Sequence, residues 1–381
     1  MSRFETLVAE TPVLVCVGPG GVGKTTSSAG IALHAAIQGK KVLVLTVDPA
    51  RRLAQSLGMD SLALDETRVC PDRLESAGIA MRGELWAMML DTRRTFDRVV
   101  GEHAPDPEAY ERIVSNRYYQ QLSTAAAGSH EYMAIEQLFA LRREGRYDLI
   151  VLDTPPSRHA FDLLDAPERM GEFFGSTSFK LVRESSRHLG RWGSGLLKKD
   201  SLLFKGVGKF LGAGVFAEII EFLQSFAGMT DGFTARGREM HDMFRSRDVA
   251  FLVMTSPDRR TIAQSLHFVR RLEERAMRVG GFMINRVRPV FLDADISDGD
   301  LEARLAAAMG GLDTEGSLAR RLASVVQAHA VLAAADAREV EALRSRLDGR
   351  FPVISVPGFA RDVVDLGGLF RFQEVAFSDA S

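Results

Sequence analysis

The sequence predicts an α/β fold with a doubly wound, mostly parallel sheet that helices cover on both faces. Short apolar runs alternate with stretches of helical periodicity, which is the pattern of strands joined by crossover helices. The runs are apolar almost throughout, as expected for strands buried on both sides. With 381 residues, 46% of them hydrophobic, the chain can also bury a large core.

Seven apolar runs are expected to form the strands of this sheet. The first, "VLVCV", ends at Gly18, and the stretch from Thr25 to about Gln38 that follows has a helical pattern with Gly39 as its C-cap. The expected strands are Val13–Val17, Val42–Val47, Leu85–Leu90, Leu149–Asp153, Val249–Thr255, Gly281–Asn285 and Pro352–Val356. A charged, alanine-rich helical stretch is expected from Leu301 to about Leu347.

Two segments interrupt the alternation of expected strands and helices, and they predict an inserted helical subdomain. No strand is expected from Thr92 to about Gly145 or from Pro167 to about Asp248. The predicted sheet domain therefore comprises residues 1–91, 147–166 and 248–381, and the helical subdomain comprises residues 92–146 and 167–247. The second insertion holds ten of the 23 phenylalanines, interleaved with glycines. These phenylalanines are either the core of the subdomain or, since glycines disfavour rigid core helices, part of a hydrophobic binding site.

Composition excludes several classes of protein. The formal net charge of -2 gives no reason to expect nucleic acid as a partner. Cys16 and Cys70 are the only cysteines and form no CxxC pair, so neither a disulfide framework nor a cysteine-based zinc site is expected. The first residues do not resemble a secretory signal, and no apolar run is long enough to span a bilayer. We expect a cytoplasmic protein.

The segment "GPGGVGKTT", Gly18 to Thr26, predicts a phosphate-binding loop. It fits G-x-x-x-x-G-K-[ST] and lies between an expected strand and an expected helix, as that motif requires. Backbone N–H groups and the helix N-terminus would face the phosphates, Lys24 would neutralise them, and the Thr25 hydroxyl would bind Mg²⁺. The candidate nucleotide-binding residues here are Gly20, Gly21, Val22, Gly23, Lys24, Thr25 and Thr26.

Two aspartates stand at the ends of expected strands, where open α/β sheets bind ligands. Asp48 begins "DPARRLA", and Asp153 begins "DTPPSRHAFDLL". A single strand-end aspartate is more often a helix cap. Beside a phosphate loop, such aspartates are candidates to hold a magnesium-bound water or to orient the attacking water.

Taken in order, GGVGKTT, VDPA, GSHEYMAIEQL and DTPPSRHAFDLL resemble the ArsA-type ATPases, P-loop NTPases that include arsenite-pump ATPases and ATPases that target tail-anchored membrane proteins. The resemblance runs from Val13 to about Leu369. It implies a dimeric enzyme that hydrolyses ATP with Mg²⁺. It also implies that Asp48 positions the hydrolytic water and that Asp153 is the Walker B aspartate beside the metal. Asn285, Pro357 and Phe359 fall where this family contacts adenine.

The sequence departs from that family at two informative positions. Pro19 stands where the family usually has a lysine that reaches the partner subunit, and Arg158 stands where the second switch usually has glycine. Arg158 in the second switch, or Arg51 and Arg52 in the first, could supply the missing positive charge at the γ-phosphate, and of these we favour Arg158. If these arginines are only exposed surface residues, we expect a slow enzyme. The alternative is a paralogous partner that donates a normal lysine. The candidate catalytic residues are therefore Asp48, Lys24 and Arg158, with Thr25 and Asp153 at the metal.

Three functions remain open. The leading one is an ATPase, slow without a partner, that acts as a dimeric switch on a hydrophobic client or membrane-protein site. Its partner would be an identical chain or an ArsA-like paralogue. The second insertion is both basic and apolar, so peripheral association with a membrane is a further option. A second is a scaffold that binds ATP but scarcely hydrolyses it, and Pro19 favours this alternative. A third is a positioning ATPase like MinD or ParA, which the long insertions and VDPA disfavour. With two cysteines, a soft arsenite site is not expected.

Overall fold

The structure is a computed structural model and describes residues 2–47, 51–117, 119–120, 129–155, 165, 229–291, 297–309 and 317–378. The strands are β1 Val13–Val17, β2 Lys41–Thr46, β3 Thr67–Arg68, β4 Glu84–Met89, β5 Leu149–Asp153, β6 Val249–Thr255, β7 Val279–Val287 and β8 Val353–Pro357. The helices are α1 Arg3–Glu10, α2 Lys24–Ile37, α3 Arg51–Ser56, α4 Pro71–Ser76, α5 Thr92–His103, α6 Pro107–Val114, α8 Ser129–Glu144, α13 Thr230–Arg245, α14 Arg259–Glu274, α15 Asp298–Met309, α16 Ser317–Leu347 and α17 Leu366–Ser378.

In the described part of the chain, these strands form one sheet in the order β3-β4-β2-β5-β1-β6-β7-β8. Every neighbouring pair is parallel except β3 and β4. The α/β fold with a mostly parallel sheet is therefore confirmed, and all seven predicted strands are present within a residue or two of their predicted ends. The two-residue β3 was missed because so short a segment carries no periodicity.

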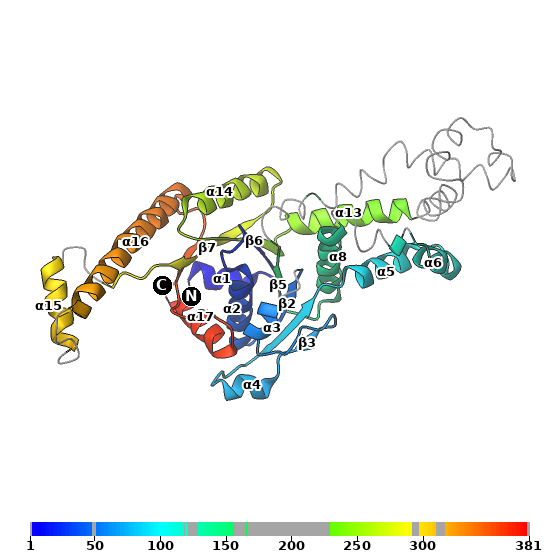
Figure 1. Cartoon of the computed structure of the whole chain (residues 1–381). Coiled ribbons are helices and arrows are strands. Elements are labelled where there is room, and N and C mark those ends of the chain that lie inside the picture. Colours follow the sequence, from blue (N-terminus) through cyan, green and yellow to red (C-terminus); the bar gives the residue numbers. More distant parts are fainter. Residues whose placement is uncertain are drawn as a thin grey trace, which may run out of the picture.

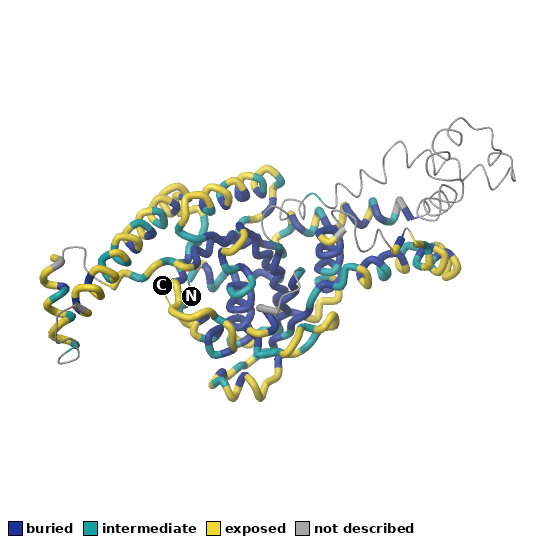
Figure 2. The backbone as a smooth tube through the Cα atoms, in the orientation of Figure 1, coloured by how far each residue is buried: buried dark blue, intermediate teal, exposed yellow. Residues whose placement is uncertain are grey.

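Two layers of apolar side chains cover the sheet, and alternate residues of β1 point into different layers. One layer contains Val13, Val15 and Val17 with side chains of α5, α8, α13 and α14. The other contains Leu14 and Cys16 with side chains of α1, α2 and α17. Figure 2 shows the buried strands at the centre of the molecule. This double covering explains why the strands read as continuous apolar runs.

The helices α5, α6, α8 and α13 extend to one side of the sheet (Figure 1). They fall in the two segments that the sequence predicts to be helical, while the division into two domains stays a prediction. Of the phenylalanines in the second segment, the structure describes Phe233 and Phe244, which are 3% and 1% exposed. These two belong to the core, and the other eight lie outside the described residues.

The C-terminal helix α17 was not predicted, yet it forms part of the core beside α2. Phe372 lies so close to α2 that a Cβ on Gly30 would come within 2.4 Å of its ring. Gln373 Oε1 is 3.0 Å from His34 Nδ1, and Phe377 stacks on the His34 ring at 3.6 Å. The glycines at the start of α17 lower its helix propensity, which conceals it in the sequence.

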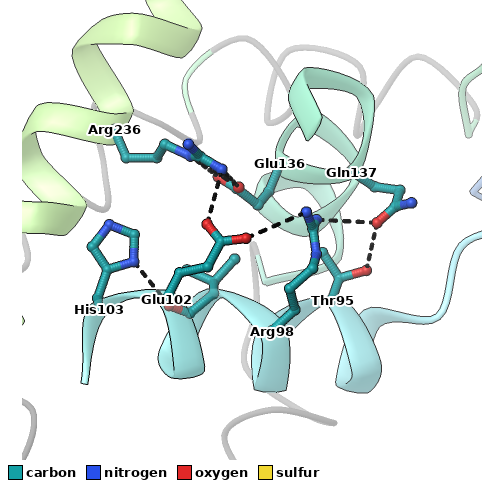
Figure 3. A network of polar contacts seen from close by, with 8 residues as sticks. Thr95, Arg98, Glu102, His103, Glu136, Gln137 and Arg236 are labelled. Atoms are coloured by element: carbon teal, nitrogen blue, oxygen red, sulfur yellow. Dashed lines mark hydrogen bonds and ion pairs between the residues drawn. The ribbon is translucent and has the colours of Figure 1, made fainter. Parts of the chain in front are cut away.

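A buried ion pair joins α8 and α13 (Figure 3). Arg236 donates to Glu136 through Nε at 3.0 Å and through Nη2 at 2.7 Å. Glu136 is fully buried and Arg236 is 8% exposed. Arg236 also contacts Glu102 of α5 at 3.2 Å, and Glu102 pairs with Arg98 at 3.7 Å. Three helices are therefore connected through one guanidinium group.

We predict that Arg236→Met destabilises the protein by about 3–5 kcal/mol, because it leaves the Glu136 carboxylate buried without its cation. Urea unfolding followed by far-UV circular dichroism measures this. The double variant Arg236→Met/Glu136→Leu should recover most of the loss, since no buried charge remains. Arg98→Met, at a partly exposed pair, is the control and should change stability by less than about 1 kcal/mol. Wild-type stability in Arg236→Met would contradict this account.

The two cysteines provide a test of the buried layer. Cys16 is fully buried in β1 and Cys70 is exposed. Burial raises the pKa of the Cys16 thiol to about 12. At pH 8 this thiol is therefore protonated as well as inaccessible, and the thiolate is the reactive form.

We predict that iodoacetamide at pH 8 alkylates Cys70 in the native protein and leaves Cys16 unmodified. Peptide mass spectrometry measures both sites, and both should react in 6 M guanidinium chloride. Equal alkylation of the two cysteines under native conditions would show that β1 is not covered as described.

Candidate active site

The phosphate loop connects β1 to α2 and depends on two glycines for its shape. A Cβ on Gly18 would come within 2.1 Å of the Met254 carbonyl oxygen of β6. Gly23 precedes α2 with φ of 88°, and a Cβ there would come within 2.3 Å of Asn285 Nδ2. Only glycine fits these two positions without displacing backbone or side chain. Gly20 and Gly21 are exposed on the loop, and Val22 is buried beneath it.

The side chain of Lys24 folds back over the phosphate loop and contacts its first residues. Its Nζ donates to the carbonyl oxygens of Gly18 at 3.1 Å and Pro19 at 3.0 Å. The side chain is 7% exposed, so the ammonium group lies inside the curve of the loop. Pro19 is buried, and its carbonyl oxygen faces this ammonium. Position 19 therefore contributes a backbone acceptor to its own loop.

Thr25 and Asp153 are brought together beside the loop. The Thr25 hydroxyl donates to Asp153 Oδ2 at 2.8 Å, and the Thr46 hydroxyl at the end of β2 contacts the same oxygen at 3.2 Å. Asp153 ends β5 and is 2% exposed. Carboxylate and hydroxyl oxygens are ligands suited to Mg²⁺. Sequence reasoning missed Thr46, although its position directly before "VDPA" was a signal.

A pocket of about 560 Å³ opens next to the start of α2. Asn285 of β7 borders it and is held by two hydrogen bonds: its Nδ2 donates to the Val22 carbonyl at 2.9 Å, and its Oδ1 accepts from the Arg286 amide at 2.9 Å. Asn285 lies inside β7, two residues before the strand ends, and not at its end as predicted. The pocket lining is Gly23, Thr26, Gln55, Asn285, Arg286, Pro357, Gly358, Phe359, Arg361, Asp362, Val363, Val364 and Phe372.

This lining contains every residue that the sequence associates with adenine. Pro357 ends β8, and Phe359 follows it with its ring centroid 6.0 Å from that of Phe372. Sequence reasoning missed Gln55, Arg286 and the α17 residue Phe372. No motif marks Gln55 or Phe372, because they reach the pocket through the packing of α3 and α17 against α2, whereas Arg286 directly follows Asn285 in β7.

Several predicted residues lie outside the described parts of the chain. Asp48 and Arg158 are among them, as is the segment from Phe204 to Gly228. For Arg51 and Arg52 the structure describes only the backbone, which forms the first turn of α3. The assignments of Asp48 and Arg158 therefore stay predictions.

Comparison with known proteins identifies the family. A family model described as anion-transporting ATPase, of ArsA type, matches residues 11–307. The putative arsenical pump-driving ATPase 2 of Aquifex aeolicus is 24% identical over 281 residues, which cover 71% of this chain and 79% of that protein.

Other similarities cover less of each chain. ATPase ASNA1 homolog 2 of Paramecium tetraurelia is 29% identical over 43% of this chain and 47% of its own length. ATPase GET3 of Malassezia globosa is 26% identical over 40% of this chain and 42% of its own length. The chain thus aligns with less than half of these two relatives. Because the family model extends from the first strand to beyond β7, the chain belongs to the ArsA-type anion-transporting ATPase family.

Proposed function

We propose that this protein is a Mg²⁺-dependent ATPase that works as a dimeric switch and controls a hydrophobic client or membrane-protein site. The observation that carries the proposal is the geometry of Lys24, Thr25 and Asp153. It places one cation, one hydroxyl and one carboxylate around the loop that holds the exposed residues Gly20 and Gly21.

In this proposal the loop binds the phosphates of ATP. The amides of Gly20, Gly21 and Gly23 and the N-terminus of α2 supply donors and positive potential. Lys24 exchanges its two carbonyl partners for phosphate oxygens, a stronger charge-assisted interaction. Its present contacts hold the ammonium close to where the phosphates would lie, so little reorganisation is needed.

The hydroxyl of Thr25 and the carboxylate of Asp153 would hold Mg²⁺. The metal supplies charge neutralisation at the β- and γ-phosphates. Asp153 is kept in place by Thr25 and Thr46, so its oxygens have one orientation before the metal binds. The buried position of this carboxylate strengthens its attraction for a divalent cation.

The adenine base would occupy the pocket beside Asn285, Pro357 and Phe359. The Asn285 side chain has one N–H and one oxygen lone pair beyond those used by Val22 and Arg286, and its orientation is fixed by these two bonds. Phe359 is 36% exposed and offers a ring face for stacking. These groups support the proposal that the pocket takes the base of ATP.

Hydrolysis would require groups beyond the described residues. We propose that Asp48 orients the attacking water and that Arg158 compensates for the missing lysine. Pro19 favours a second candidate, in which the chain binds ATP but hydrolyses it slowly unless an ArsA-like paralogue supplies a lysine. Turnover measured with and without such a partner distinguishes the two.

A membrane-spanning helix, which would need a long and strongly apolar stretch, is not found among the described residues.

We predict that Lys24→Ala lowers the affinity for Mg–ATP by at least about tenfold, because the phosphates lose their main side-chain counterion. Isothermal titration calorimetry measures the affinity. The control is Lys41→Ala, which removes a partly exposed lysine at the start of β2 that pairs with Glu84 at 3.6 Å. Unchanged affinity in Lys24→Ala would refute a nucleotide site at this loop.

We predict that Asp48→Asn preserves ATP binding while turnover falls by about 10²-fold or more, since the amide cannot polarise the attacking water. Steady-state phosphate release and calorimetry separate the two effects. Asp60→Asn, at a largely exposed carboxylate, is the matched control and should be neutral. Equal losses of binding and turnover in Asp48→Asn would instead indicate a structural or metal-positioning role.

A further inference from the structure

A second groove, of about 560 Å³, runs along the outer edge of β8. It lies between the start of α1 and the C-terminal end of α16, and its floor is formed by Val353, Ile354 and Ser355. The groove shares no lining residue with the adenine pocket. Pro357, at the other end of β8, belongs to that pocket instead. The two cavities therefore occupy opposite ends of one strand.

The outer edge of β8 has backbone groups available for another strand. The Phe282 amide donates to the Pro352 carbonyl at 2.9 Å, and the Gly358 amide donates to the Val287 carbonyl at 2.8 Å. Even-numbered residues of β8 therefore face β7, and the N–H and C=O groups of Val353 and Ser355 face outward. In the described part of the chain, no strand pairs with this edge. Pro357 has no N–H and limits the edge to a short segment.

Two arginines flank this edge from opposite sides. Arg3 belongs to α1, which packs in the α2 layer, whereas Arg344 belongs to α16, which packs in the α14 layer. Arg3 donates to the carbonyl oxygens of Gly349 at 2.9 Å and Arg350 at 3.5 Å. Arg344 donates to Ser355 Oγ at 3.3 Å.

Both guanidinium groups are exposed, and neither has a carboxylate partner among the described residues. By contrast, the neighbouring Arg350 pairs with Glu273 at 2.9 Å. None of the described residues that line the groove is acidic. The groove therefore combines an open strand edge with two uncompensated positive charges.

We propose that this groove binds an extended segment of a partner protein, which adds to β8 as a strand and carries two adjacent acidic residues. The outward groups of Val353 and Ser355 would supply the main-chain hydrogen bonds. Adjacent side chains of a strand project to opposite faces, so one carboxylate would reach Arg3 and the next would reach Arg344. A free anion would satisfy the arginines but leave the strand edge unpaired. The proposal does not depend on nucleotide hydrolysis.

Fluorescence polarisation with the full-length protein tests the proposal. The probe is a labelled ten-residue peptide in which a central Asp–Glu pair is flanked on each side by four residues of alternating threonine and valine. Comparison peptides carry a central Lys–Lys pair, or the same acidic pair with N-methylated central amides. We expect the acidic peptide to bind and both comparison peptides to bind at least about tenfold more weakly.

Charge-reversal variants locate the site. Arg3→Glu and Arg344→Glu should each weaken binding of the acidic peptide by about tenfold. Arg346→Glu, on the same helix but outside the groove, should leave it unchanged. The double variant Arg3→Glu/Arg344→Glu should prefer the Lys–Lys peptide, which a merely misfolded protein would not do.

Three results would overturn the proposal. The first is no binding of the acidic peptide to the wild-type protein up to millimolar concentration. The second is equal weakening by Arg346→Glu, which would indicate a diffuse charge effect. The third is undiminished binding of the N-methylated peptide, or full displacement of the acidic peptide by inorganic phosphate. Either outcome would identify a small-anion site without strand pairing.

Discussion

The organisation of the site depends on one buried carboxylate, that of Asp153 at the end of β5. A charge that is 2% exposed must be compensated by hydrogen bonds or cations. Here the hydroxyl groups of Thr25 and Thr46 approach the same oxygen from α2 and β2. This requirement fixes the start of α2 relative to the sheet and, through α2, the position of the phosphate loop. The parallel sheet makes the arrangement possible, because the carboxyl ends of β1, β2 and β5 meet at one edge.

The arrangement of Lys24 follows from the same geometry. Since α2 begins at Lys24, its side chain can fold back over the loop and contact the carbonyls of Gly18 and Pro19. A lysine at position 19 would have to leave this buried turn to reach a partner, whereas the proline keeps its ring within it. The substitution is therefore compatible with an intact loop. Under the proposed function, its effect would fall on the charge at the γ-phosphate and not on the loop conformation.

The sequence predicts the sheet well because each strand is buried on both faces and bounded by turn residues, as the runs ending at Gly18 and Asp153 illustrate. It also points to Lys24 and Thr25, since the phosphate loop imposes a fixed spacing on local residues, and to Asp153, since that residue ends an apolar strand. It does not predict Thr46, Gln55 or Phe372. Gln55 and Phe372 reach the pocket through the packing of distant helices, which their local sequence does not encode, whereas Thr46 was marked only by its place directly before "VDPA". Helix α17 escaped detection for a related reason, as its stability comes from contacts with α2.

If the pocket beside Asn285 binds adenine as proposed, the contribution of α17 to its lining has a consequence for biosynthesis. The phosphate loop and α2 are made early, but Phe372, which forms part of the pocket wall, is made near the end of the sequence described. Until α17 has left the ribosome and packed beside Gly30, the pocket lacks that wall. A nascent chain with a fully folded phosphate loop would therefore hold nucleotide by its phosphates alone. Tight binding of the base would begin only after α17 has been translated.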